Sequence, residues 1–125
     1  MPAPKAILTY HSLDTSGAVT SLDPAIFRRQ MDWLAATSIP VLPLREIRDA
    51  QAGLALTFDD GYRNLLHHAL PVLAEKHFPA SFFVNSASAG RGNEHLDWPA
   101  LREAASAGIE IGSHGIEHLD LARVP

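Results

Sequence analysis

Short apolar runs alternate with helix-like segments along this chain, and the alternation limits the possible folds more than any other feature. The apolar runs lie at residues 6–10, 39–43, 54–58, 80–84 and 109–112. Each is short enough for a strand and is bounded by glycine, proline or polar residues. Strands that alternate with helices at such short spacing form right-handed βαβ units and a parallel sheet. We therefore expect an α/β fold with about five parallel strands, covered by helices on at least one face.

The segments between these runs carry signals for helix starts and breaks. Asp23-Pro24 and Asp97-Trp98-Pro99 each place a capping carboxylate just before a proline in the first helical turn. A helical pattern also covers residues 64–77, where Pro71 removes a backbone donor and must kink the helix or divide it into two pieces. A short helix is expected at residues 44–50. These signals place a helix in each of the longer connections.

Composition excludes several kinds of site and partner. The 125 residues contain no cysteine, so disulfides and thiolate metal sites are impossible, and the apolar share of 46% suits one domain. A formal charge of −4 argues against a nucleic-acid surface. No apolar run approaches the roughly 20 residues of a membrane span. Residues 1–5 contain no signal-peptide core, so the chain as written is expected to be cytoplasmic, or extracytoplasmic if a leader was removed.

Polar side chains follow most of the predicted strands. His11 follows the first run, Asp59 and Asp60 follow the run at residues 54–58, Asn85 follows the next, and His114 comes just after the last. In parallel α/β folds, functional residues gather in the loops at the carboxyl ends of the strands. We therefore expect these side chains to converge on one rim of the sheet.

Asp59-Asp60-Gly61 places two carboxylates side by side at a strand end. Neighbouring side chains of a strand point to opposite faces, so both acids can serve one site only where the chain leaves strand geometry. Gly61 permits such a turn. Taken alone, the same three residues are more typical of a plain turn with helix capping.

His114 and His118 are the second half of the candidate site. If residues 114–118 form a helical turn, spacing of four puts both imidazoles on one side, although two histidines at this spacing are more often solvated surface residues. An Asp and two His match the ligand set of a catalytic zinc or similar ion. Such an ion lowers the pKa of a bound water from 15.7 to roughly 7, and the remaining Asp could accept its proton. The residues alone leave open which Asp has which role.

Two motifs carry a family resemblance. Thr57-Phe58-Asp59-Asp60-Gly61-Tyr62 and Ser113-His114-Gly115-Ile116-Glu117-His118 resemble the first two motifs of polysaccharide deacetylases, the NodB-homology or carbohydrate esterase family 4 group. The resemblance implies a distorted (β/α) barrel that removes acetyl groups from N- or O-acetylated carbohydrate. It also implies that Asp59 is the general base and that Asp60, His114 and His118 hold a divalent ion, usually zinc.

Later motifs of that family supply an arginine, an aromatic groove wall and a histidine acid, and none of them can be placed in this sequence. We therefore expect residues 1–125 to be the N-terminal part of a single catalytic domain, with an incomplete barrel. An incomplete barrel exposes an apolar strand edge, which predicts self-association. Two alternatives stay open: a noncatalytic fragment that binds a metal or a partner, and hydrolysis of a non-sugar C–N amide on the same scaffold.

Other histidines and an aromatic residue complete the candidates. His11 is compatible with a site-proximal role or with a structural hydrogen bond at its strand end. Tyr62 is compatible with lining a sugar groove or with packing beneath the loop. The remaining histidines are expected to be solvated and to have no role in the site; these are His67, His68, His77 and His95.

Overall fold

The computed structural model describes residues 4–125 and has a parallel sheet at its centre. Four strands pair in the order β1-β4-β5-β6, and every pairing is parallel. Their bounds are Lys5–Tyr10 for β1, Gly53–Asp59 for β4, Ser81–Val84 for β5 and Glu110–Ser113 for β6. Four of the five predicted runs are therefore strands, and the α/β prediction is confirmed.

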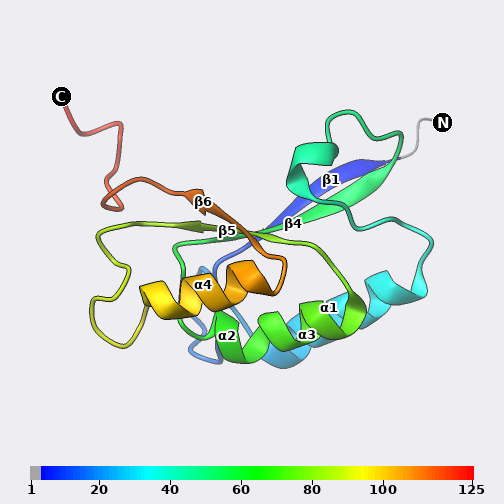
Figure 1. The fold of residues 1–125 in the computed structure, drawn as a ribbon, viewed down its shortest axis with the longest axis horizontal. Helices are drawn as coiled ribbons and strands as arrows, with labels where there is room; N and C mark the ends of the chain where they lie inside the picture. Colours follow the sequence, from blue (N-terminus) through cyan, green and yellow to red (C-terminus); the bar gives the residue numbers. More distant parts are fainter. Residues whose placement is uncertain (1–3) are drawn as a thin grey trace.

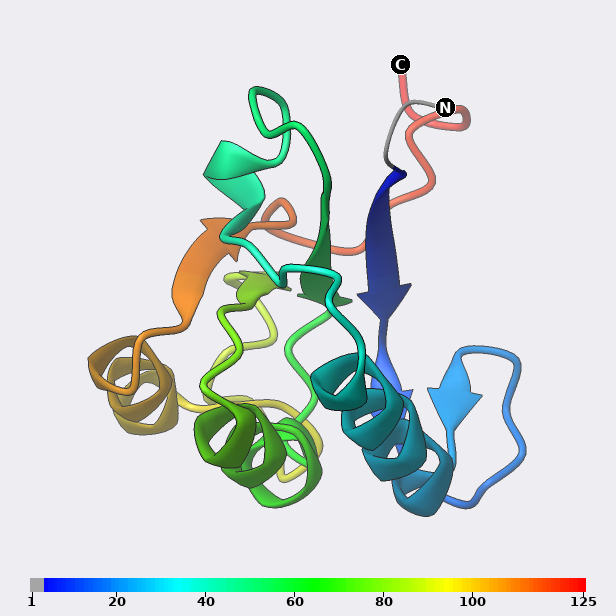
Figure 2. The same ribbon diagram turned by 90° about the vertical axis from the view of Figure 1, so that its right-hand side faces the viewer.

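The α-helices cover one face of this sheet (Figures 1 and 2). Their bounds are Pro24–Ala36 for α1, Leu65–His68 for α2, Leu70–Lys76 for α3 and Trp98–Ser106 for α4. The Asp23 and Asp97 carboxylates cap α1 and α4, accepting hydrogen bonds from backbone amides at 2.7 and 2.9 Å. Pro71 lies in the first turn of α3, so the predicted division of residues 64–77 is confirmed.

Aromatic rings form the centre of the core between sheet and helices. Phe27 of α1, Phe58 of β4 and Phe82 of β5 are fully buried. Phe58 contacts both of the others edge to face, at centroid distances of 5.8 and 5.3 Å, and stacks on Tyr10 at 5.3 Å. Such ring pairs stabilise a core by about 0.5–1.5 kcal/mol each beyond their burial. β4 therefore holds the two flanking strands and α1 in a fixed arrangement.

The expected strand at residues 39–43 is wrong. Only an isolated bridge between Val41 and Leu54 forms there, with backbone hydrogen bonds of 2.8 and 2.9 Å. Pro40 and Pro43 flank the bridge and have no amide hydrogen to donate, so a regular ladder cannot extend. The main sheet consequently has four strands rather than five. The following helix is a single 3-10 turn, η1 (Leu44–Glu46).

Two further strands lie where the sequence predicts only a loop. β2 (Ser12–Leu13) and β3 (Ser21–Leu22) form a separate two-stranded parallel sheet. Strands of two residues have no periodicity that a sequence pattern could reveal. They fix the segment that follows β1, which brings His11 to the carboxyl end of the main sheet.

Within residues 4–125 the sheet ends at β1 on one side and at β6 on the other. β1 pairs with β4 alone among the described residues, and its side chains Ile7 and Leu8 are 51% and 36% exposed. No helix within residues 4–125 has the length and apolar character needed to cross a bilayer. The expectation about a leader concerns the first five residues, of which residues 1–3 lie outside the described part of the chain.

The chain leaves strand geometry directly after Asp59. Asp60 has a φ of 74° and Gly61 a φ of 67°, two successive left-handed residues that turn the chain away from β4. A Cβ added to Gly61 would lie 2.9 Å from Cγ1 of Val84, the last residue of β5. Glycine is therefore required at this position for two reasons: the left-handed backbone angle and the close approach of β5.

We predict that Gly61→Ala destabilises the protein by about 2–4 kcal/mol, because it combines left-handed strain with overpacking against Val84. Gly90→Ala is the matched control: its φ is 77°, but a Cβ there would meet nothing within 4 Å. This control should lose only about 1 kcal/mol. Urea unfolding of both variants measures the difference, and equal losses would show that the contact with Val84 is unimportant.

Candidate metal centre

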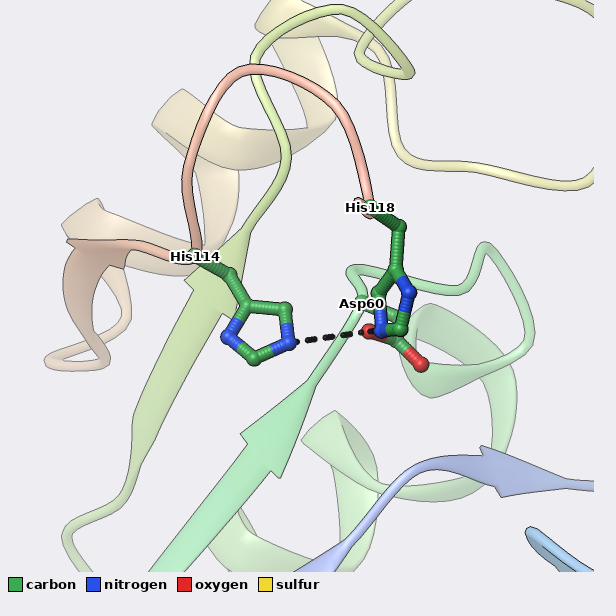
Figure 3. Close-up of side chains that lie close together, drawn as sticks. All are labelled: Asp60, His114 and His118. Atoms are coloured by element: carbon green, nitrogen blue, oxygen red, sulfur yellow. Dashed lines mark ion pairs between the residues drawn. The ribbon is translucent and has the colours of Figure 1, made fainter. Parts of the chain in front are cut away.

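Asp60, His114 and His118 lie together at the carboxyl ends of the strands (Figure 3). Oδ1 of Asp60 is 3.3 Å from Nε2 of His114 and 3.2 Å from Nε2 of His118. One potential ligand atom from each residue lies within 4.8 Å of the other two. The turn after β4 and the loop after β6 thus bring together three side chains that are distant in sequence.

The two histidines do not lie on a helical turn. The sequence predicts that their spacing of four aligns the imidazoles only if such a turn forms. Residues 114–118 form an irregular loop with bends at 116 and 117. Gly115 has a φ of 88°, which is incompatible with a right-handed helix. The imidazole centroids are nevertheless only 5.3 Å apart, because the loop folds back over the turn at Asp60.

The loop after β5 holds this histidine loop in place. The buried side chain of Asn85 donates a hydrogen bond of 2.5 Å from Nδ2 to the carbonyl of His114. The backbone amides of Ser86 and Ala87 donate to the carbonyls of Gly115 and Ile116 at 3.1 and 2.9 Å. The loop conformation therefore depends on contacts from a neighbouring strand end rather than on local helix geometry.

The surroundings of the Asp60 carboxylate indicate whether these residues fit a metal ion. Its Oδ1 is buried, and within residues 4–125 no side-chain or backbone group donates a hydrogen bond to it. Leaving a buried acceptor unpaired costs about 1–3 kcal/mol, and more for a charged group. Asp60 also holds a strained left-handed backbone, a feature that concentrates at functional sites. Carboxylate oxygen and imidazole nitrogen suit zinc and similar divalent ions, so the residues fit such an ion.

A pocket of about 420 Å³ opens beside these residues, and we call it the metal pocket. Its lining residues are His11, Thr20, Asp60, Tyr62, Asn85, Ser88, His95 and His118. The structure thus brings His11, Tyr62 and Asn85 to the rim that the strand-end argument predicts. His67, His68 and His77 are exposed, in agreement with the sequence analysis.

The expectation that His95 is a solvated residue without a place in the site is wrong. His95 is half-buried, lines the metal pocket and stacks on Tyr62, with ring centroids 5.3 Å apart and planes inclined by 22°. An isolated antiparallel bridge between the two residues produces this contact. The bridge pairs a turn with a long loop, so no local pattern around His95 reveals it.

Tyr62 combines both of the roles considered for it. Its ring packs against the hydrophobic core and also lines the metal pocket. Burial raises the pKa of its phenol, and the nearby Asp60 carboxylate raises it further. The phenol is therefore neutral at physiological pH and offers the pocket a hydrogen-bond donor.

Asp59 lies next to the three clustered side chains but faces a different partner. Its Oδ2 is 3.9 Å from Nε2 of His11, and both side chains are partly exposed. Asp59 is the last residue of β4, whereas Asp60 has already entered the turn. The two neighbouring carboxylates consequently differ in surroundings: Oδ1 of Asp60 is buried near two histidines, and the Asp59 side chain is 22% exposed and lies near His11.

Comparisons with known proteins agree on one family. YxkH of Bacillus subtilis (strain 168), whose name marks it as a provisional polysaccharide deacetylase, is 33% identical over 128 residues. That match covers 96% of this chain and 45% of YxkH. The poly-beta-1,6-N-acetyl-D-glucosamine N-deacetylase of Escherichia coli (strain K12) is 26% identical over 133 residues, which cover 86% of this chain and 20% of that protein.

Solved structures share the fold. IcaB from Ammonifex degensii superposes with a TM-score of 0.81 at 25% identity, covering 90% of this chain and 53% of that one. The Streptococcus pyogenes deacetylase PplD, solved in complex with acetate, gives a TM-score of 0.85 at 21% identity over 100% of this chain and 62% of that one. The fold is thus part of the deacetylase (β/α) barrel. The chain spans 45% and 20% of the lengths of the two curated relatives.

The family model described as polysaccharide deacetylase matches residues 47–125. This range is more than half of the chain and contains the turn at Asp60 as well as both clustered histidines. The chain belongs to the polysaccharide deacetylase family.

Proposed function

We propose that this chain supplies the metal half of an active site that hydrolyses acetyl groups from N- or O-acetylated carbohydrate. In this proposal Asp60, His114 and His118 hold a divalent ion, most simply zinc, and Asp59 is the general base. The observation that carries the proposal is the buried, unpaired Oδ1 of Asp60 between two imidazole nitrogens. The N-deacetylase name of the Escherichia coli relative supports an amide-linked acetyl group on a hexosamine polymer as the substrate.

In this proposal the chain's own residues have two roles, proton transfer and the orientation of other groups in the site. A bound divalent ion would supply Lewis acidity toward water and the acetyl carbonyl. Asp59 would accept the proton of the attacking water, because its side chain is the more exposed of the two, at 22% against 12% for Asp60, and does not belong to the ligand cluster. His11, 3.9 Å from Asp59, would orient the base or contact the substrate. Asn85 keeps His114 in position through the loop carbonyl.

We further propose that residues 1–125 are the N-terminal part of a single catalytic domain, in which the remaining groove residues and the general acid come from elsewhere. The partial coverage of the relatives supports this reading. The same coverage favours a second candidate function, a noncatalytic fragment that binds a metal without turnover. Hydrolysis of a non-sugar amide is a third candidate, which differs from the first only in substrate.

Zinc binding tests the ligand set directly. Wild-type chain should bind one zinc ion in isothermal titration calorimetry, while His114→Ala and His118→Ala should each bind about 100-fold more weakly or not at all, because each removes one of three ligands. His68→Ala, an exposed histidine on α2, is the control and should bind normally. Equal zinc affinity in the wild type and the two loop variants would exclude the proposed site.

Asp59→Asn tests the role of the base separately from the metal. Acetate release from an N-acetylglucosamine oligomer should fall by about 10²–10⁴-fold, while zinc affinity stays within about twofold of wild type. Both this chain and a longer form of the protein should be assayed. Zinc binding without acetate release by the short chain alone would support the fragment function, and an active Asp59→Asn enzyme would remove Asp59 from the mechanism.

We also propose that two copies of this chain associate through β1. A mainly apolar groove of about 870 Å³ lies between β1 and α1 and is lined by Leu8, Ile26 and Trp33 among others. Trp33 is 60% exposed and β1 has no outer neighbour within residues 4–125. An uncovered apolar edge strand is a template for pairing with an identical strand.

Ile7→Lys should prevent this association, because a charge on an edge strand opposes strand pairing. The control is Val19→Lys, which changes a fully exposed apolar residue away from β1. Light scattering after size exclusion should detect a dimer for wild type and Val19→Lys and a monomer for Ile7→Lys. A wild-type chain that stays monomeric at high micromolar concentration would contradict the proposal.

A further inference from the structure

Asn64 stands just before α2, but its side chain does not cap that helix. An asparagine in this position usually accepts a hydrogen bond from a backbone amide two or three residues later. Asn64 instead has helical backbone angles, with φ at −63° and ψ at −15°, and its side chain makes no capping bond within the described part of the chain. Its backbone carbonyl accepts from the amides of His67 and His68. The side-chain amide is therefore available for another part of the fold.

Both ends of this side-chain amide bond to the segment that follows His11. Oδ1 of Asn64 accepts from the backbone amide of Leu13 at 3.1 Å, and Nδ2 donates to the hydroxyl of Ser12 at 2.7 Å. Ser12 and Leu13 are buried, and they lie 52 and 51 positions before Asn64. One side chain thus joins the turn after β4 to strand β2.

The Asp14 carboxylate fixes the direction of these bonds. It accepts the hydroxyl hydrogen of Ser12. Hydrogen bonds from Ser12 and two further serines hold the pKa of this carboxyl well below its usual range, so it stays charged. Since Ser12 has donated its one hydrogen to Asp14, it can only accept from Asn64. The residue at position 64 must therefore donate to Ser12 and accept from Leu13 at the same time, as a side-chain amide does.

His11 lies between two residues that the fold holds firmly. Tyr10, the last residue of β1, is 9% exposed and packs in the aromatic core. Ser12, on the other side, is held by the amide described above and by a bond from its own backbone amide to the Thr20 carbonyl at 3.2 Å. Nε2 of His11 lies 3.9 Å from Oδ2 of Asp59 in this arrangement. The distance between the two side chains therefore depends on both residues that flank His11.

We infer that Asn64 is a positioning residue that sets the distance between His11 and Asp59. It ends the turn that begins at Asp60, and its amide ties this turn to the segment that carries His11. The inference rests on the proposed function, in which Asp59 is the general base and His11 orients it. A misplacement of about 1 Å in a catalytic arrangement can cost roughly 10²-fold in rate. Asn64 thus contributes to turnover through His11, without touching the substrate.

Kinetics of the longer form of the protein test whether Asn64 acts through His11. Asn64→Ala should lower kcat on an N-acetylglucosamine oligomer about tenfold, the equivalent of about 1.4 kcal/mol, and leave KM within about twofold. His11→Ala should lower kcat at least as much. Adding Asn64→Ala to His11→Ala should change kcat by less than about twofold, because a residue that acts through His11 has no effect once that ring is absent. A merely structural role would give losses that multiply.

A second readout needs no turnover and uses the 125-residue chain. The wild type should show a nuclear Overhauser contact by NMR between the His11 ring and the Asp59 side chain, which lie 3.9 Å apart. Asn64→Ala should abolish this contact, because the segment after His11 loses both of its bonds to position 64.

Thr37→Ala is the matched control. Thr37 is also half-buried and stands at a helix end, where its hydroxyl donates to the Leu34 carbonyl at 2.8 Å and accepts from the Ile39 amide at 3.3 Å. This variant should lose stability but keep both the NMR contact and kcat. If Asn64→Ala does not fold, Ser12→Ala, which removes the acceptor of the Nδ2 bond, decides by the same measurements.

Three results would each overturn the inference: losses in kcat that multiply, an unchanged NMR contact in Asn64→Ala, or full activity of His11→Ala. Failure of the proposed function is a different result. It would appear as lost zinc binding, or as no acetate release from the wild-type longer form. The NMR contact between His11 and Asp59 would still show in that case whether Asn64 positions the two side chains.

Discussion

The turn at Asp60 and Gly61 is the constraint on which the rest of the site depends. It turns the chain out of β4, buries one oxygen of Asp60 and allows the end of β5 to approach, because Gly61 has no Cβ to meet Val84. The close approach of β5 places Asn85 where it holds the carbonyl of His114. The same turn also pairs with residues 94–96 and so fixes the ring of Tyr62. One local conformation therefore positions side chains from three loops.

Local signals predicted the parts of the fold that local interactions determine. Asp23, Asp97 and Pro71 mark helix starts through capping or a missing amide, and the apolar runs around Phe58 and Phe82 form buried strands. The rule that functional residues gather at the carboxyl ends of parallel strands was sufficient to bring Asp60, Asn85 and His114 to one rim. This prediction required no distances between the side chains.

The errors occur where contacts between distant segments decide the structure. Residues 39–43 are apolar enough for a strand, but prolines limit them to a single bridge to β4. The histidine loop bonds to residues 85–87 instead of to itself, so helical spacing was the wrong reason for its two imidazoles to meet. His95 joins the site through a bridge to Tyr62, which lies far earlier in the chain. The residues that neighbour them in sequence do not indicate which distant segment each one contacts.

The structure also distinguishes a set of candidate metal ligands from a complete active site, two properties that a family resemblance implies together. The candidate ligands come from the turn after β4 and the loop after β6, and the pairing of β4, β5 and β6 supports them within this chain. Within residues 4–125 the sheet has two open edges: β6, and β1 on the far side of β4 from β5. The contacts between Asp60, His114 and Asn85 involve no residue of β1. The candidate ligand cluster is therefore built on the β4–β6 half of the sheet, whereas turnover requires a complete substrate groove, and an intact ligand set alone does not imply a working enzyme.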